Sequence, residues 1–132
     1  MRLAQLFSCL FFLFGIASLQ ANQEPRCFSL ESKEIKLIGI VRWENFKDAE
    51  QKSEKSLILY LSKKICVKKG NDEFLQNNLI VDKVQLVPNN EKIKDFNFEK
   101  KKVLAIGTLF SAHTAHHHMP ILLSLDRIEM VK

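Results

Sequence analysis

The stretch "EIKLIGIVRW" at residues 34–43 sets the class of fold. Ile35, Leu37, Val41 and Trp43 fall on one side at a period of two, and Gly39 stands in the same row. This period predicts a β-strand with one face turned toward a core. Gly39 has no side chain to pack there, so it indicates a bend or bulge of the kind that a small barrel needs.

Four further segments outside this stretch also predict strands, at residues 56–69, 79–87, 101–110 and 119–131. Leu57, Leu59 and Leu61 share one face of the first of these segments. In the next, Ile80, Val84 and Leu86 are expected to point inward, and Pro88 ends it because proline cannot donate to a strand ladder. The polar residues 44–55 predict an exposed loop, since they lack a regular apolar stripe.

A short helix is expected between the third and fourth strands. Asn90 can cap the segment "EKIKDFNF" at residues 91–98, in which Ile93 and Phe96 share a helical face. The order of strand, strand, strand, helix, strand, strand is that of the OB-fold. The sequence therefore predicts an all-β domain with one short helix, a small five-stranded OB-fold-like Greek-key barrel over residues 22–132. The competing architecture is an open antiparallel sheet with the helix packed on one face.

Residues 1–21 have the layout of a secretory signal peptide. Arg2 precedes an apolar run without any acidic residue, and the segment ends on small residues. Cleavage is expected either after Ala17 or after Ala21. The apolar core is short for a membrane span, which needs roughly 20 residues, although an uncleaved anchor helix is the alternative. We therefore expect a periplasmic or secreted protein with no stable membrane insertion once the signal is removed.

Two cysteines remain beyond this segment, Cys27 and Cys66. An even pair in an oxidising compartment predicts a disulfide, and the alternative is two buried free thiols. The chain has 20 basic and 15 acidic residues, and Arg2 is the one basic residue within 1–21, so the remainder carries 19 − 15 = +4. The lysines alternate with acids rather than forming one motif, so we expect no nucleic-acid partner. The positive net charge favours attraction to acidic surfaces, or it serves only to keep the protein soluble.

The only histidines of the chain stand together at residues 113–118. His113, Thr114, His116, His117 and His118 lie in the connection between the fourth and fifth predicted strands. In extended backbone, alternate rings point the same way, so His116 and His118 should share a side that His117 does not. Connections at this place in an OB-fold flank the usual ligand-binding face. These five residues are therefore the candidate ligand-binding site.

Three interpretations of this cluster are open: a metal site, a catalytic site and a structural role. Neutral imidazoles bind zinc, copper or nickel, and His113, His116 and His118 are the candidate metal ligands. Catalysis would need a nucleophile such as Ser111 or Thr114 together with an orienting carboxylate, and no known nucleophile motif is present, so we expect no enzyme. The structural alternative is that His113, Thr114 and one further ring hold the hairpin through hydrogen bonds to loop backbone.

Taken together, the last strands and the histidine segment resemble a known family. The segments "LIGIV" at 37–41, "KKICVKKG" at 63–70, "KVQLV" at 83–87 and "GTLFSAHTAHHHMPILL" at 107–123 resemble the bacterial DUF4431 family. The resemblance extends over nearly all of residues 27–130 and implies an exported domain without a settled activity. Ala115 stands where the family pattern has glycine, and a positive φ there would strain an alanine.

The function expected from these observations is that of an exported, non-enzymatic binding module. Its ligand would be an envelope protein or a glycan, bound by the segments 44–55 and 111–119, and an inhibitor or immunity-type role suits such a small domain. The alternative is a periplasmic metal-binding protein that uses the histidines. No other cofactor is expected.

Overall fold

The computed structural model describes residues 23–31, 33–94 and 97–132. The predicted signal peptide therefore lies outside the described residues. In chain order the elements are six strands and one short helix: β1 (Cys27–Ser29), β2 (Ile35–Lys47), β3 (Ser53–Lys68), β4 (Leu79–Pro88), α1 (Glu91–Lys94), β5 (Lys102–Ser111) and β6 (Ile121–Met130). No helix of this part of the chain is long and apolar enough to cross a membrane.

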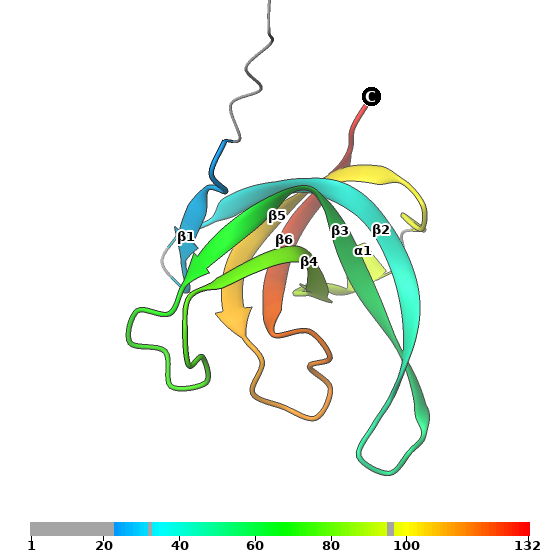
Figure 1. Ribbon diagram of the computed structural model, residues 1–132. Helices are drawn as coiled ribbons and strands as arrows, with labels where there is room; N and C mark the ends of the chain where they lie inside the picture. Colours follow the sequence, from blue (N-terminus) through cyan, green and yellow to red (C-terminus); the bar gives the residue numbers. More distant parts are fainter. Residues whose placement is uncertain (1–22, 32, 95–96) are drawn as a thin grey trace, which may run out of the picture.

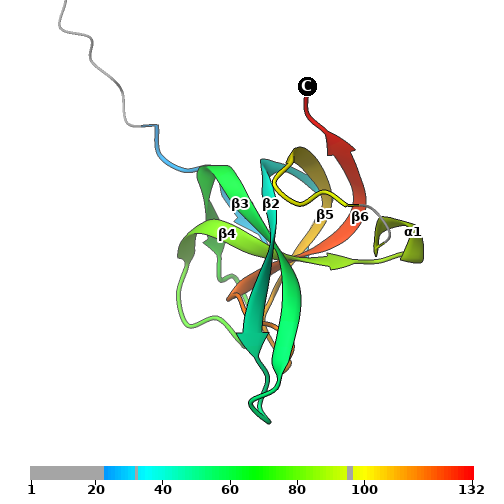
Figure 2. The same cartoon turned by 90° about the vertical axis from the view of Figure 1, so that its right-hand side faces the viewer.

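Five of the strands close into a ring (Figures 1 and 2). β2 pairs antiparallel with β3 and with β5, β3 pairs antiparallel with β4, and β5 pairs antiparallel with β6. A parallel pairing between β4 and β6 closes the circle. This is the connectivity of the OB-fold, so the predicted five-stranded barrel is confirmed.

The core fills the interior of this ring. Alternate residues of each strand point inward, and Val41, Leu59, Val84, Leu123 and Leu125 have no exposed surface. The residues of the core cluster and those packed against it lie between Phe28 and Ile128. Within the described residues, the interior is thus built by side chains of the six strands and the segments that connect them.

Close strand contacts explain two glycines of the barrel. A Cβ atom at Gly39 would overlap the carbonyl oxygen of Tyr60, and one at Gly107 would overlap that of Ser124. Gly107 also lies where the register of β5 against β6 shifts. Both positions thus need glycine because another strand's backbone passes over them, in keeping with the bend that the sequence indicated at Gly39.

The predicted loop at 44–55 was wrong in extent. β2 and β3 continue as a paired ribbon through Glu44↔Ser56 to Lys47↔Ser53, which leaves a turn of residues 48–52. Trp43, expected in the core, is 41% exposed. This ribbon projects beyond the barrel, and its half-buried face carries Glu44 and Glu54 beside Phe46, so its strands show no apolar stripe for a sequence pattern to detect.

The inward placement of Ile80 was also wrong, because its side chain is 64% exposed. The pairing of β3 with β4 shifts register between Tyr60 and Ile65. This irregularity reverses the alternation within β4, so Val81 lies partly buried at the start of the strand while Val84 and Leu86 point inward further along.

The N-terminal strand β1 was not predicted. It pairs parallel with the end of β3, and a disulfide joins Cys27 to Cys66 within this pairing. The helix is shorter than the predicted 91–98: α1 ends at Lys94, and Phe96 lies outside the described residues. Asn90 caps this turn, since its side-chain oxygen accepts a hydrogen bond from the Ile93 N–H at 3.1 Å.

Candidate functional site

The histidine loop, residues 112–120, connects β5 to β6 at the end of the barrel that also carries the 48–52 turn (Figure 1). The Ala112 N–H donates to the Pro120 carbonyl at 3.0 Å and closes the base of the loop. The His117 N–H donates to the Thr114 carbonyl at 3.1 Å and forms a turn at its tip. The loop is therefore an ordered excursion of a barrel hairpin.

His113 and His117 hold the loop together from inside. The Nδ1–H of His113 donates to the Ser111 carbonyl at 2.9 Å, since a carbonyl oxygen can only accept. The Nδ1 of His117 accepts from the backbone N–H groups of His113 at 3.0 Å and Thr114 at 3.3 Å. The structural role expected for His113 and for one further ring is confirmed.

The acceptor role of His117 requires an unprotonated Nδ1. Burial lowers the pKa of His117, and the neighbouring rings of His113, His116 and His118 lower it further. The ring of Phe110 meets that of His117 edge-on, with centroids 5.4 Å apart. Protonation of His117 would cost the loop both backbone hydrogen bonds, because the ring nitrogen would become a donor.

Asp72 joins the histidine loop to the loop between β3 and β4. Its Oδ2 accepts from the Ser111 hydroxyl at 2.8 Å, and its Oδ1 accepts from the N–H groups of Phe74 and Leu75 at 2.8 Å. Burial opposes the charge of this carboxylate, but the hydrogen bonds from Ser111, Leu75 and Phe74 lower the pKa of Asp72 overall. Ser111, a nucleophile candidate by proximity, is buried and donates to this carboxylate.

His116 and His118 turn the other way and meet one carboxylate. The Nδ1 of His116 lies 2.6 Å from Glu54 Oε1, and the Nε2 of His118 lies 2.9 Å from Glu54 Oε2. The ring of His118 stacks on Phe46 with centroids 4.5 Å apart, and its side chain is only 8% exposed, whereas that of His116 is 71% exposed. His116 and His118 thus share a side, as expected, although the backbone from Thr114 to His117 forms a turn instead of the extended conformation on which that expectation was based.

Glu54 is the charged centre of this cluster. The hydrogen bond from His118 lowers the pKa of Glu54, burial acts against it, and the hydrogen bond from His116 and the charges of both rings lower it again. The carboxylate is thus ionised under ordinary conditions and favours ring nitrogens that donate toward it. It ties the β2–β3 ribbon to the histidine loop.

Gln85 of β4 holds the loop against the strands through two hydrogen bonds. Its side chain is 6% exposed, and its Nε2 donates to the His116 carbonyl at 3.0 Å. Its Oε1 accepts from the His118 N–H at 2.7 Å. One amide thereby satisfies a donor and an acceptor of the loop backbone on either side of His117, and holds the loop against the strands.

A shallow pocket of about 370 Å³ opens beside this contact. Trp43 and Glu54 form one wall, and His116 and His117 form another, with Gln85 and Pro88 also in the lining. The wall combines an exposed indole with an ionised carboxylate and an exposed imidazole. Such a pocket can stack an apolar face and accept or donate hydrogen bonds at its rim.

The structure divides the predicted metal ligands. His116 and His118 share Glu54, while His113 faces Ser111 and packs beside His117, with ring centroids 4.7 Å apart. Within the residues described here, no group of three or more His, Cys, Asp or Glu side chains is placed to hold a metal ion. Metal binding by His113, His116 and His118 stays a prediction.

The sequence reasoning missed Glu54, Phe46 and Gln85. Glu54 and Phe46 stood in the segment taken as a loop, where no period marked them. A signal for Gln85 was present, because a polar residue interrupts the apolar run "KVQLV" at 83–87. Ala115 carries no strain, since among the described residues other than glycine only Glu31, Gln51 and Lys100 have positive φ.

Comparison with known proteins places part of this architecture in a family. No curated protein and no solved structure matches the chain. A family model described as "Domain of unknown function (DUF4431)" matches residues 83–129, which run from the middle of β4 to near the end of β6. The matched part contains Gln85 and the whole histidine loop, whereas the segments 37–41 and 63–70 lie outside it. Residues 83–129 thus match the DUF4431 family model, which supports the resemblance noted in the sequence.

Proposed function

We propose that the protein is an exported, non-enzymatic binding module whose ligand enters the pocket between Trp43, Glu54 and His116. The observation that carries the proposal is the 41% exposure of Trp43 beside the carboxylate–imidazole pair. A large aromatic ring left in solvent has little structural use, but it supplies much of the contact area of binding sites. The ligand is an envelope protein or a glycan, and an inhibitor or immunity-type role is one form of the former.

The rigidity of the site supports this proposal. The histidine loop is held by three side chains: Gln85 hydrogen-bonds to its backbone, Glu54 contacts the His116 ring, and Asp72 accepts from Ser111 at the start of the loop. A binding surface that is ordered before the ligand arrives loses less conformational entropy on binding. The hydrogen bonds to the rings of all four histidines also account for these residues without invoking acid–base chemistry.

Affinity capture from an envelope extract tests the proposal. Residues 22–132, which include the whole described core, would be immobilised as wild type and as Trp43→Ala/His116→Ala. We expect the wild type to retain a defined partner that the variant loses by at least about tenfold. The control is Ile80→Ala, which truncates a still more exposed apolar side chain away from the pocket. Equal recovery by all three proteins would contradict the proposal.

Two further measurements distinguish a glycan ligand and a metal ligand from a protein ligand. Sedimentation with purified cell-wall glycan, followed by the same comparison of variants, would assign the pocket to a sugar. Calorimetric titration with zinc, copper and nickel checks the metal alternative. Micromolar binding that His116→Ala and His118→Ala abolish would favour metal over the binding-module assignment.

A further inference from the structure

A second and larger cleft opens in the barrel wall, away from the histidine loop. Its volume is about 870 Å³. It lies where β2 and β3 separate: β2 pairs with β3 from Gly39 onward, and β1 joins β3 at Cys66. Residues 36–38 and 62–65 consequently face each other without a strand of the described chain between them.

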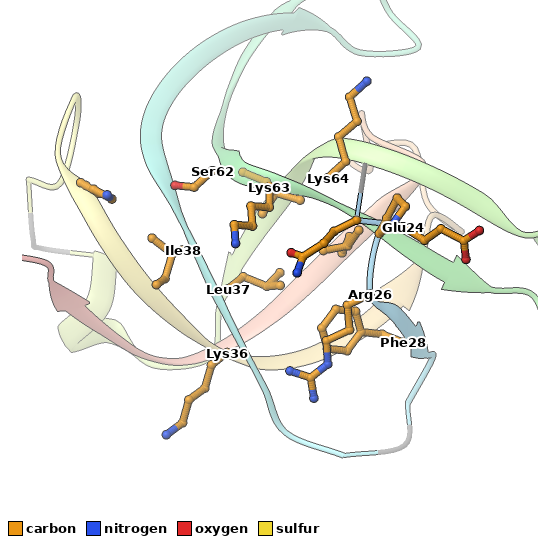
Figure 3. Close-up of a pocket in the computed structure, with 14 residues that line it drawn as sticks. Glu24, Arg26, Phe28, Lys36, Leu37, Ile38, Ser62, Lys63 and Lys64 are labelled. Atoms are coloured by element: carbon orange, nitrogen blue, oxygen red, sulfur yellow. The ribbon is translucent and has the colours of Figure 1, made fainter. Parts of the chain in front are cut away.

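The floor of this cleft is apolar. Leu37 and Ile65 belong to the core and are 4% and 5% exposed, and both line the cleft together with Leu61 and Phe28. An apolar chain that entered between the two strands would therefore rest directly on the edge of the core. In Figure 3 the side chains of Leu37 and Ile38 lie on β2 beneath the labelled lysine Lys63.

The rim of the cleft is cationic. Arg26, Lys36, Lys63, Lys64 and Lys102 line it, and Glu24 is the one carboxylate among the lining residues. Figure 3 shows Lys36 and Lys64 extending from opposite sides of the cleft. The formal balance of these lining side chains is 5 − 1 = +4, so the potential at the rim favours an anion.

The outer face of β2 adds exposed apolar surface next to these cations. Ile38 and Ile40 are 43% and 39% exposed and alternate with Gly39, so they share the face of Lys36. Cations and aliphatic side chains that face the same way match a bilayer interface, where phosphate groups lie above acyl chains. An extended acidic peptide would need the charges but not the neighbouring isoleucines.

We propose that this cleft binds an anionic phospholipid of a membrane surface, with the headgroup phosphate on the rim lysines and part of an acyl chain on the apolar floor. The wall of the cleft begins at Gln23, four positions after Leu19, the last large apolar residue of the leader. Four residues span at most about 14 Å, so in the alternative in which the leader stays uncleaved as a membrane anchor, it would hold the cleft beside the bilayer.

Vesicle sedimentation tests the proposal with residues 22–132, so that the apolar leader contributes nothing. The vesicles contain phosphatidylglycerol and phosphatidylcholine in equal amounts, or phosphatidylcholine alone. We expect partitioning onto the anionic vesicles only. Lys36→Glu/Lys63→Glu should lower the partition coefficient by at least about tenfold. Ile38→Ser should lower it without changing its dependence on salt, since it removes apolar contact and no charge.

The matched control is Lys47→Glu/Lys52→Glu, which changes the net charge equally on the β2–β3 ribbon at the far end of the barrel. We expect it to lower partitioning less than about twofold, because charges farther than a Debye length from the surface are screened. Thermal melting verifies that every variant is folded. A spin-labelled phosphatidylglycerol should broaden the amide signals of residues 36–38 and 62–65.

Three results would overturn the assignment. The first is binding to neither kind of vesicle, and the second is an equal loss in both double variants, which would indicate unspecific attraction. The third is saturable binding of an alternating Glu–Val peptide to residues 36–38 without vesicle binding, which would assign the cleft to a protein strand. Each result leaves the Trp43 pocket to be judged separately, because no residue is common to the two sites.

Discussion

The Gln85 side chain makes a donor and an acceptor contact with the histidine loop from a nearly solvent-free position. A polar residue here is useful because the loop carries backbone groups toward the strands that water cannot reach. The loop in turn covers this amide. Neither side is satisfied without the other, and the pair therefore couples the outer face of β4 to the rim of the proposed binding pocket.

Replacing Gln85 by leucine should destabilise the protein and release the loop. The change leaves the His118 N–H and the His116 carbonyl without their partner, which costs about 1–3 kcal/mol in the free energy of unfolding. Urea denaturation measures the loss, and amide exchange of residues 116–118 should accelerate. Gln76→Leu is the control, since Gln76 is exposed. An unchanged midpoint in Gln85→Leu would show that water replaces the amide.

His117 should make stability depend on pH. Its pKa is lowered in the folded protein, so the unfolded chain binds a proton more readily than the folded one. The stability that the neutral ring contributes is complete above the ordinary histidine value of about 6.5 and is lost as the pH falls through the lowered pKa. Denaturation midpoints from pH 8 to pH 5 measure this loss.

The control for that titration is His116→Ala, because His116 is largely exposed and accepts no loop N–H. It should preserve most of the decline, because burial is a larger cause of the lowered pKa of His117 than the His116 ring, whereas His117→Ala should reduce the decline at the expense of lower stability at pH 8. A ring signal of His117 that titrates above 6.5 in a two-dimensional NMR experiment would contradict the assigned role of its Nδ1.

At the scale of elements, the sequence predicted most where strands have one dry face. The apolar period of two located the strands that build the core, since burial imposes that period directly. It failed on Trp43 and on residues 44–47, because the inner face of this ribbon is only half-buried and carries polar as well as apolar side chains, so no apolar period marks it. It failed on Ile80 because the β3–β4 irregularity reverses the alternation, and pairing between distant strands is not encoded within either one.

The candidate site was predictable in the same uneven way. The histidines were evident as a cluster, and the shared side of His116 and His118 was predicted, although the loop forms a turn where extended backbone was assumed. The partner of His116 and His118 was not evident, because Glu54 is 62 positions from His116 and approaches it only through the closed barrel. The split between His113 and the other two proposed ligands likewise depends on tertiary contacts. Local pattern gave the residues but not their grouping.

The crossing of β5 and β6 at Gly107 gives a prediction about this element pair. Gly107→Ala places a methyl group against the Ser124 carbonyl, which belongs to backbone and cannot rotate away. We expect a loss of about 1–3 kcal/mol, measured by thermal denaturation. Gly70→Asn is the control, because Gly70 has open space around it and asparagine tolerates its φ of 52°. Equal stability of both variants would mean that β6 shifts at little cost.

For the whole molecule, the disulfide between Cys27 and Cys66 secures the unpredicted strand β1 to the barrel. The two residues are 39 positions apart, and a cross-link over such a loop stabilises a protein by about 4 kcal/mol through the unfolded chain. Cys27→Ser/Cys66→Ser should therefore lower the urea midpoint of residues 22–132 by the corresponding amount. If neither dithiothreitol nor the double substitution changes the urea midpoint, the disulfide does not contribute the expected stability.

β6 is the last strand of the ring in chain order, and it pairs with β5 on one side and with β4 on the other. A chain that has emerged from a ribosome or a translocation pore only as far as residue 120 thus leaves two strand margins uncovered. Uncovered margins recruit strands from other molecules. Incomplete chains are therefore protected from aggregation only once the final ten-residue strand β6 has paired. A chaperone that holds the unfolded chain matters most before that point.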